Sequence, residues 1–97
     1  MTEPTSALKG EDLKQAHGRL DGWTLVGVQH IEKEYRFKDF AEALAFVNRL
    51  GEAAEAQGHH PDVFLTWGRV KVTLSTHSAG GLTASDFKLA ARADAVR

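Results

Sequence analysis

The 97-residue chain lacks cysteine altogether, contains only two prolines and has almost no excess of charge of either sign. The absence of cysteine excludes disulfide bonds, thiolate nucleophiles and cysteine-ligated zinc or iron–sulfur clusters. The net charge of −1 provides no basic excess for binding phosphate backbones, so we expect no nucleic-acid partner. No apolar run approaches the roughly 20 residues of a membrane span, and the first residues lack the apolar stretch of a secretory signal. We therefore expect a cytoplasmic protein without a membrane partner.

The composition that remains is typical of one folded domain. Hydrophobic residues make up 42 % of the chain and charged residues 26 %, as in globular proteins rather than disordered ones. We expect a single domain over residues 1–97, with residues 1–9 as a loose lead-in. A chain of this size buries only about 60 to 68 % of its unfolded surface, so we also expect a homo-oligomer.

The first half of the sequence predicts a helix, two strands and a longer helix. Residues 11–20 carry apolar side chains at helical spacing, and residues 23–26 favour a short strand. Residues 31–38 alternate with the period of two that a half-buried strand shows. The longer helix is expected from Phe40 to Gln57, with Asp39 as its N-cap. Its expected sheet-facing stripe is Phe40, Ala43, Leu44, Val47, Leu50 and Ala54.

The second half of the sequence predicts a hairpin and a last helix. Residues 63–65 and 69–75 have the pattern of strands, and Gly68 between them is a hairpin signal. Thr83 to Asp86 have the spacing of a capping box, in which each end residue accepts a hydrogen bond from the backbone of the other. A helix is therefore expected over residues 84–96.

These elements together predict the fold class. Antiparallel strands with one apolar face require helices on that face. We expect an α+β fold in which three helices pack on one face of a four-stranded antiparallel sheet, in the order α-β-β-α-β-β-α. The aromatic residues expected in the core are Phe40, Phe46 and Phe87.

Histidine is the residue type left to carry acid–base chemistry. The chain has five: His17, His30, His59, His60 and His77. Their protonation would move the formal charge from −1 to +4, so they dominate the pH response near neutrality. His59 and His60 follow the end of a predicted helix, and His77 follows a predicted strand, where positioned imidazoles can transfer protons. We expect His17 and His30 to be surface residues without a role.

Simpler interpretations of the same residues stay open. The His59-His60 pair could be only a polar helix exit, and Asp86 only the acidic member of the capping box. Trp67 could be a packing or interface residue. A zinc site is disfavoured, because adjacent residues in extended backbone point to opposite sides and no His-x-x-x-His pair is present. No Gly-x-Ser-x-Gly turn marks a nucleophilic serine.

The spacing of these residues resembles the signature of a known family. Glu55, His59-His60-Pro61, Trp67, His77 and Asp86 resemble the polar positions of the pterin-4a-carbinolamine dehydratases. The resemblance covers residues 13–94 and includes four further segments, at 22–23, 37–40, 70–77 and 80–83. Three positions depart from the family pattern: Gly58, Trp67 and Gly68 stand where relatives carry Asp, Tyr and Asn.

The resemblance implies a fold and a reaction. The family packs helices on one face of a four-stranded antiparallel sheet and forms dimers or tetramers. Its reaction dehydrates 4a-hydroxytetrahydropterin to quinonoid dihydropterin, which recycles the pterin cofactor of aromatic amino acid hydroxylases. The resemblance therefore implies a pterin substrate, a functional link to such a hydroxylase, and no metal or separate cofactor.

The resemblance also implies roles for individual residues. His59 and His77 would be the acid and base groups, and His60 would position the substrate and share in the proton transfer, so all three are implied catalytic residues. Glu55 would tune the histidine pair, and Asp86 would hold the far side of the site. The remaining implied substrate contacts are Pro61 and Trp67 as a wall, and Ser75, Thr76 and Ser78 beside His77.

An alternative from another class of protein is a non-catalytic interaction module. Such a module would keep the fold and stabilise the oligomer of a partner protein. It would tolerate loss of the histidine set, whereas an acid–base enzyme requires that set. The presence of all the signature histidines and carboxylates favours the enzyme.

Overall fold

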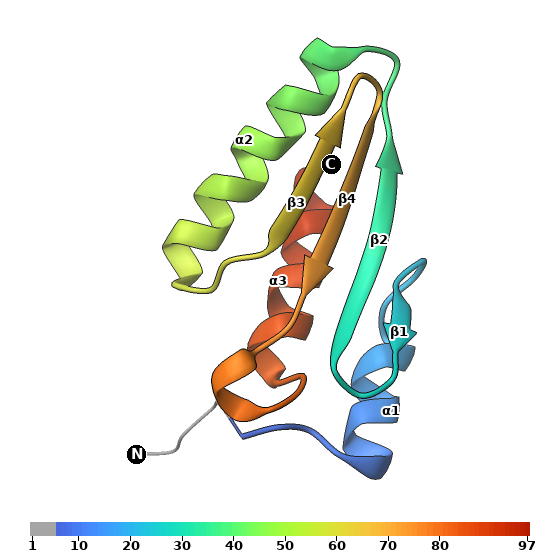
Figure 1. Cartoon of the computed structure of the whole chain (residues 1–97), viewed down its shortest axis with the longest axis vertical. Coiled ribbons are helices and arrows are strands. Elements are labelled where there is room, and N and C mark those ends of the chain that lie inside the picture. The colour runs from blue at the N-terminus through green and yellow to red at the C-terminus, as the bar shows by residue number, and fades with distance from the viewer. Residues whose placement is uncertain (1–5) are drawn as a thin grey trace.

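The computed structural model describes residues 6–97 and contains three α-helices and one four-stranded sheet (Figure 1). Residues 1–5, part of the expected lead-in, lie outside the described residues. The order α-β-β-α-β-β-α confirms the predicted α+β class. The elements are α1 (Gly10–Gly18), β1 (Thr24–Val26), β2 (His30–Arg36), α2 (Phe40–Gln57), β3 (Asp62–Thr66), β4 (Arg69–Leu74), a 3-10 turn (His77–Ala79) and α3 (Ala84–Val96).

The sheet is antiparallel throughout, with the strand order β1-β2-β4-β3. Strands β3 and β4 form a hairpin, in which Asp62 pairs with Thr73 at one end and Thr66 with Arg69 at the other. Because β2 pairs Ile31 with Leu74, the start of β2, the start of β3 and the end of β4 share one end of the sheet. The loops that carry His59, His60 and His77 leave from that end.

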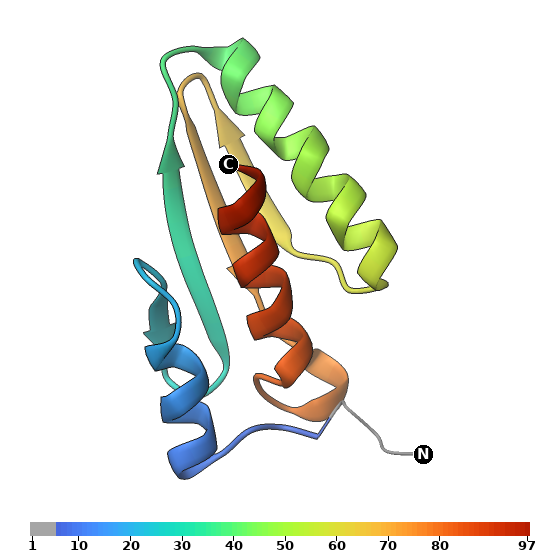
Figure 2. The same cartoon turned by 180° about the vertical axis from the view of Figure 1, so that it is seen from behind.

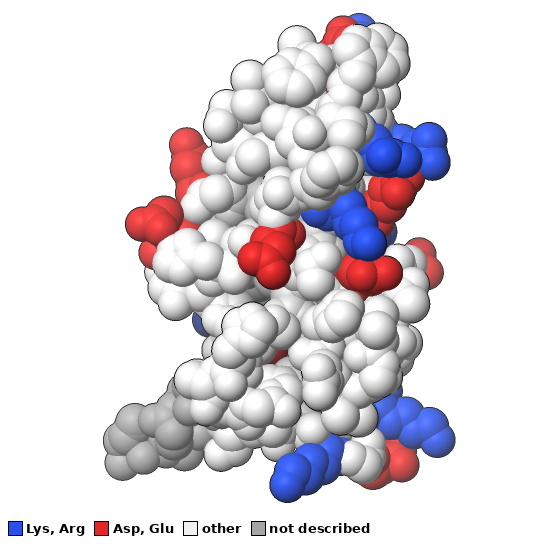
Figure 3. All heavy atoms as spheres, viewed as in Figure 1, with Lys and Arg blue, Asp and Glu red and all other residues white. Residues whose placement is uncertain are grey.

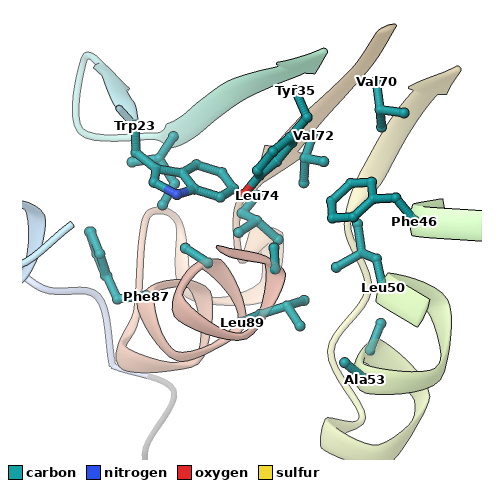
Figure 4. Close-up of a cluster of buried hydrophobic side chains, with 14 of the residues drawn as sticks. Trp23, Tyr35, Phe46, Leu50, Ala53, Val70, Val72, Leu74, Phe87 and Leu89 are labelled. Atoms are coloured by element: carbon teal, nitrogen blue, oxygen red, sulfur yellow. The ribbon is translucent and has the colours of Figure 1, made fainter. Parts of the chain in front are cut away.

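The hydrophobic core lies between one face of the sheet and helices α2 and α3 (Figures 2 and 4). Alternate strand residues such as Tyr35 and Val72 point into it, as the period of two predicts. Phe46 and Leu50 of α2 meet them with no exposed surface. The other face of the sheet is exposed and carries interspersed acidic and basic side chains (Figure 3).

Helix α2 has the predicted ends, and of its expected stripe Ala43, Leu50 and Ala54 are buried whereas two residues are exposed. The Asp39 carboxylate accepts a hydrogen bond from the Glu42 backbone at 2.9 Å, and Gly58 ends the helix in the left-handed conformation. The expectation that Phe40 and Leu44 face the sheet is wrong, because their side chains are 45 % and 40 % exposed. Phe46 faces the sheet instead and is fully buried. Phe40 lies six residues earlier, which is not a whole number of helical turns, so its side chain points away from that contact.

A polar cluster around Asp94 ties the end of α3 to the sheet. The Asp94 carboxylate accepts hydrogen bonds from the Tyr35 hydroxyl at 2.5 Å, Lys33 Nζ at 2.9 Å and Trp23 Nε1 at 3.2 Å. Burial raises the pKa of Tyr35 far above its ordinary value, and the hydrogen bond to Asp94 raises it further. The folded protein therefore holds Tyr35 in its neutral form.

No helix among residues 6–97 is both long enough and apolar enough to cross a membrane. The longest, α2, has 18 residues and carries charged side chains along its exposed side.

We predict that alkaline pH destabilises the protein through Tyr35. An unfolded tyrosine ionises near pH 10, whereas folded Tyr35 stays protonated, so the unfolded state binds fewer protons above that pH. The free energy of unfolding should therefore be unaffected by Tyr35 below about pH 10 and fall by about 1.4 kcal/mol per pH unit above it. Denaturant titration of the wild type and Tyr35→Phe measures this difference.

Tyr35 is the only tyrosine in the chain, so tyrosinate absorbance provides a direct control. Absorbance should increase only when the protein unfolds. A rise near pH 10 in protein that is still folded would contradict the prediction.

Candidate active site

The predicted site residues other than Trp67 lie where α2 ends, β4 ends and α3 begins. After Gly58 reverses the chain, the His59 backbone N–H donates to the Ala54 carbonyl at 3.1 Å. This bond fixes the first histidine against the last turn of α2. Thr76 follows β4, and Asp86 lies in the first turn of α3. Three elements distant in sequence therefore contribute to one region.

The buried carboxylate of Asp86 joins these elements. Asp86 has no exposed surface, and His59 Nε2 lies 2.6 Å from its Oδ1. Its Oδ2 accepts from the Thr76 hydroxyl at 2.7 Å and from the Thr83 backbone N–H at 2.9 Å. A buried ionised carboxylate requires such partners, because it has lost its hydration. Both oxygens are satisfied.

Asp86 thus has the two roles that sequence analysis treated as alternatives. The capping box with Thr83 is present, so Asp86 caps α3 as predicted. The same carboxylate also contacts His59, whose side chain is only 16 % exposed. A carboxylate that is ionised can only accept, so in this pair His59 donates through Nε2 and its Nδ1 faces away from Asp86 as the second ring nitrogen.

His60 points to a different carboxylate. Its Nε2 lies 2.5 Å from Glu55 Oε2, in a pair whose two side chains are 62 % and 78 % exposed. Consecutive histidines in extended backbone diverge, as expected. Glu55 was expected to tune both histidines, but the structure pairs it with His60 alone. Because water screens exposed charges, this pair adds little to the stability of the fold. Its effect is to orient the His60 ring.

The turn after β4 carries His77 beside this network. His77 begins the 3-10 turn and is exposed, with its Nε2 3.5 Å from the Ser75 hydroxyl, at the outer limit of a hydrogen bond. Ser78 follows it and is also exposed. Thr76 precedes it and is bonded to Asp86, so the Asp86 carboxylate links the His59 ring to the His77 turn.

Open space adjoins these residues on two sides. A hollow of about 860 Å³ is lined by the end of α2 together with Glu55, His60 and Pro61. A smaller cavity of about 180 Å³ is lined by Ser75, Thr76 and His77 with the Gly80-Gly81 backbone. The single chain therefore does not place the three histidines around one enclosed cavity.

Trp67 is not part of this region. It lies at the tip of the β3–β4 hairpin, next to the pair Thr66 and Arg69, and is 68 % exposed. Pro61 directly precedes Asp62, the residue at the opposite end of β3. The expected wall of Pro61 and Trp67 within one chain is therefore wrong, because a full strand length separates them. The strand predicted over residues 63–65 carried this signal, because it lies between the two positions, whereas the family spacing alone did not.

The two histidines expected to be idle surface residues are both half-buried. His17 Nε2 lies 2.7 Å from the Trp23 carbonyl, so this ring ties α1 to the segment before β1. His30 lies 3.7 Å from Glu32 and lines the small cavity together with His77. The sequence pattern did not predict the His17 contact, because Trp23 lies beyond the end of α1 and helical spacing describes contacts within a helix only.

Among residues 6–97, no three His, Asp or Glu side chains are arranged to hold a metal ion. Two of the site histidines form imidazole–carboxylate pairs instead, His59 in a buried pair and His60 in an exposed one. Such pairs orient a ring and its proton. The fold and the site thus define a small α+β protein with a histidine site equipped for proton transfer.

The comparisons with known proteins agree with this class. A family model described as pterin 4 alpha carbinolamine dehydratase matches residues 6–96. The chain belongs to the pterin-4-alpha-carbinolamine dehydratase family, which confirms the resemblance found in the sequence.

Curated relatives carry the family name. A relative from Rubrobacter xylanophilus is 51 % identical over 87 residues, which cover 90 % of this chain and 81 % of the relative. One from Vibrio cholerae is 46 % identical over 92 residues, covering 92 % of this chain and 84 % of the relative. Both are named as pterin-4-alpha-carbinolamine dehydratases.

Solved structures extend the similarity to proteins with further roles. A protein from Brucella melitensis, described as a transcriptional coactivator/pterin dehydratase, has a TM-score of 0.89 at 38 % identity, covering 94 % of this chain and 98 % of that one. A pterin dehydratase-like protein described as a RuBisCO assembly factor in the alpha-carboxysome has a TM-score of 0.66 at 26 % identity. That match covers 78 % of this chain and 89 % of the other.

We predict that Asp86→Asn destabilises the fold. The asparagine amide has the same shape but only one oxygen, so its NH₂ group faces a donor that now bonds to a carboxylate oxygen. The lost hydrogen bond should lower the free energy of unfolding by about 1 to 3 kcal/mol. Chemical denaturation measures this change. Glu55→Gln is the matched control in an exposed pair, and its effect should stay below about 0.5 kcal/mol. Equal effects of the two substitutions would show that the Asp86 network does not stabilise the fold.

Proposed function

We propose that the protein is a dehydratase that removes water from 4a-hydroxytetrahydropterin and releases quinonoid dihydropterin. The observation that carries the proposal is the buried Asp86 carboxylate, which orients His59 beside the turn of His77. Membership in a family named for this reaction supports it.

The reaction requires two proton transfers and no covalent intermediate. An acid donates a proton to the 4a-hydroxyl group, the C4a–O bond breaks and water leaves. A base removes the proton from N5, and the electron pair of that N–H bond forms the C4a–N5 double bond. Imidazole groups can serve as both acid and base at neutral pH.

The contacts of each histidine suggest its part in these steps. The hydrogen bond to Asp86 holds the proton on His59 Nε2, so Nδ1 of the neutral ring is available as a base. His77, on the exposed turn, is the second proton-transfer group. His60, held by Glu55, positions the substrate. The remaining substrate contacts proposed are Pro61, Ser75, Thr76 and Ser78.

The proposal includes the setting of the enzyme. The pterin is the substrate, and we propose that no separate cofactor or metal is needed. We further propose that the protein acts in the cytoplasm as a homodimer or homotetramer, and that it serves an aromatic amino acid hydroxylase by recycling its pterin.

A second candidate function is a non-catalytic interaction module that stabilises the oligomer of a partner protein. The descriptions of the two solved relatives as coactivator and assembly factor favour this alternative. The intact pairs His59 with Asp86 and His60 with Glu55 favour the enzyme, because a module has no need of oriented imidazoles.

We predict that loss of either proposed proton-transfer histidine slows the reaction. His59→Gln and His77→Gln should each reduce kcat for carbinolamine dehydration by about 100-fold or more, the usual contribution of general acid–base catalysis. Stopped-flow absorbance of the pterin measures the rate. His17→Gln is the matched control and should retain the wild-type rate, since His17 lies outside the proposed site.

Three results would contradict the dehydratase assignment. The first is a wild-type rate no faster than that of the buffer. The second is that both histidine variants match the wild type. The third is a partner protein that still binds the double variant while no pterin chemistry is detected, which would establish the interaction module.

We also predict that the wild-type rate depends on pH. Histidine is the side chain that ordinarily changes charge between about pH 5 and 8, and one imidazole must start protonated while another starts neutral. The rate should pass through a maximum in a series from about pH 5.5 to 8.5. A flat profile over this range would exclude histidine as the working acid and base.

A further inference from the structure

A hollow of about 510 Å³ lies at the opposite end of the sheet from the histidines. Four of its lining residues are basic: Arg36 ends β2, Lys38 follows that strand, Arg49 lies in α2 and Arg97 follows α3. We call it the basic hollow and define it by its lining, which is Arg36, Phe37, Lys38, Glu42, Ala45, Arg49 and Arg97.

Two of its arginines are held in place by backbone carbonyls. Arg49 Nε donates to the Val96 carbonyl at 2.7 Å, and Arg97 Nη2 donates to the Arg36 carbonyl at 2.6 Å. The Arg97 guanidinium also lies over the Phe37 ring, 5.1 Å from its centroid. Each guanidinium therefore keeps a fixed plane with further N–H donors available, which lowers the entropy lost on binding a ligand.

These two arginines have no acidic partner within residues 6–97. The basic residues nearby differ, because Arg36 pairs with Glu34 at 2.8 Å and Lys38 with Glu42 at 3.7 Å. Glu42 is the one acidic side chain in the lining, so the side-chain charge of the basic hollow is +3. The whole chain has a net charge of −1, so this positive charge is local.

The chemistry of the lining favours a phosphate group over other anions. A phosphate dianion has several oxygens that can accept hydrogen bonds at once, so it can bind donors from more than one side. A carboxylate has two oxygens, and a single guanidinium group can satisfy both of them. A nucleic acid would need an extended basic surface, and the face shown in Figure 3 intersperses acidic with basic side chains. The volume lies within the range of small-molecule sites.

We propose that the basic hollow binds a phosphate dianion, either as free phosphate or as the phosphate of a small monoester. Arg49 and Arg97 hold it through charge-assisted hydrogen bonds, and Lys38 adds a third positive charge. The site is separate from the histidine network, so the proposal does not depend on dehydratase activity.

The test is a titration of the full chain with inorganic phosphate and, separately, with glycerol 3-phosphate. Chloride keeps the ionic strength constant, because exposed charges are screened by salt. We expect saturable shifts of the Arg49 and Arg97 side-chain N–H signals in nitrogen-15 NMR spectra. Tighter binding of glycerol 3-phosphate would identify a monoester as the ligand, and equal or weaker binding would identify free phosphate.

Substitutions assign the binding to the basic hollow. The double variant Arg49→Gln and Arg97→Gln should weaken binding at least about ten-fold, since each arginine loses charge-assisted hydrogen bonds. Arg92→Gln is the matched control on the exposed side of α3 and should bind as the wild type does. Lys38→Gln removes one exposed charge and no buried contact, so this variant should fold. It should weaken binding measurably, and it keeps the test valid if the double variant does not fold.

Three outcomes would overturn the proposal. Shifts that grow without saturation would show only general screening, and unchanged affinity in Lys38→Gln together with the double variant would place binding elsewhere. Tighter binding of a short glutamate peptide than of either phosphate would show that the hollow fits carboxylates.

Discussion

The buried carboxylate of Asp86 is the interaction on which the site depends. It caps α3 through Thr83, accepts from Thr76 after β4, and contacts His59 after α2. Because a carboxylate without exposed surface has lost its hydration, it must keep all of these partners together. The same group therefore stabilises the packing of three segments and orients a histidine, so folding and site assembly are one event.

The sheet topology keeps the two proposed sites at opposite ends of one small chain. The strand order β1-β2-β4-β3 places the ends of β4 and α2 at one end of the sheet, and the end of β2 with the end of α3 at the other. The histidine network lies at the first end and the basic hollow at the second. The core between them keeps the two regions apart, so substitutions in one should leave the other unchanged.

Local patterns were sufficient for much of the fold. Asp39 and Gly58 marked the ends of α2, and the spacing of Thr83 and Asp86 marked the start of α3, because caps depend on residues within one turn. Local patterns failed where contacts between segments far apart in the chain decided whether a side chain is buried. Phe40 has helical spacing to the core residues, yet the direction from which α2 meets the sheet leaves it 45 % exposed. Trp67 has the family spacing, yet the hairpin carries it away from Pro61.

The sequence by itself determined the element order, the fold class and the family, because these follow from residue types at short spacings. It also singled out His59, His60 and His77 as candidates for proton transfer, because imidazole changes its charge near neutral pH. Only the tertiary structure decided which carboxylate meets which histidine, that His17 ties down α1, and that Arg49 and Arg97 share a hollow. These contacts join segments far apart in the chain, and only the packing of the helices on the sheet brings them together.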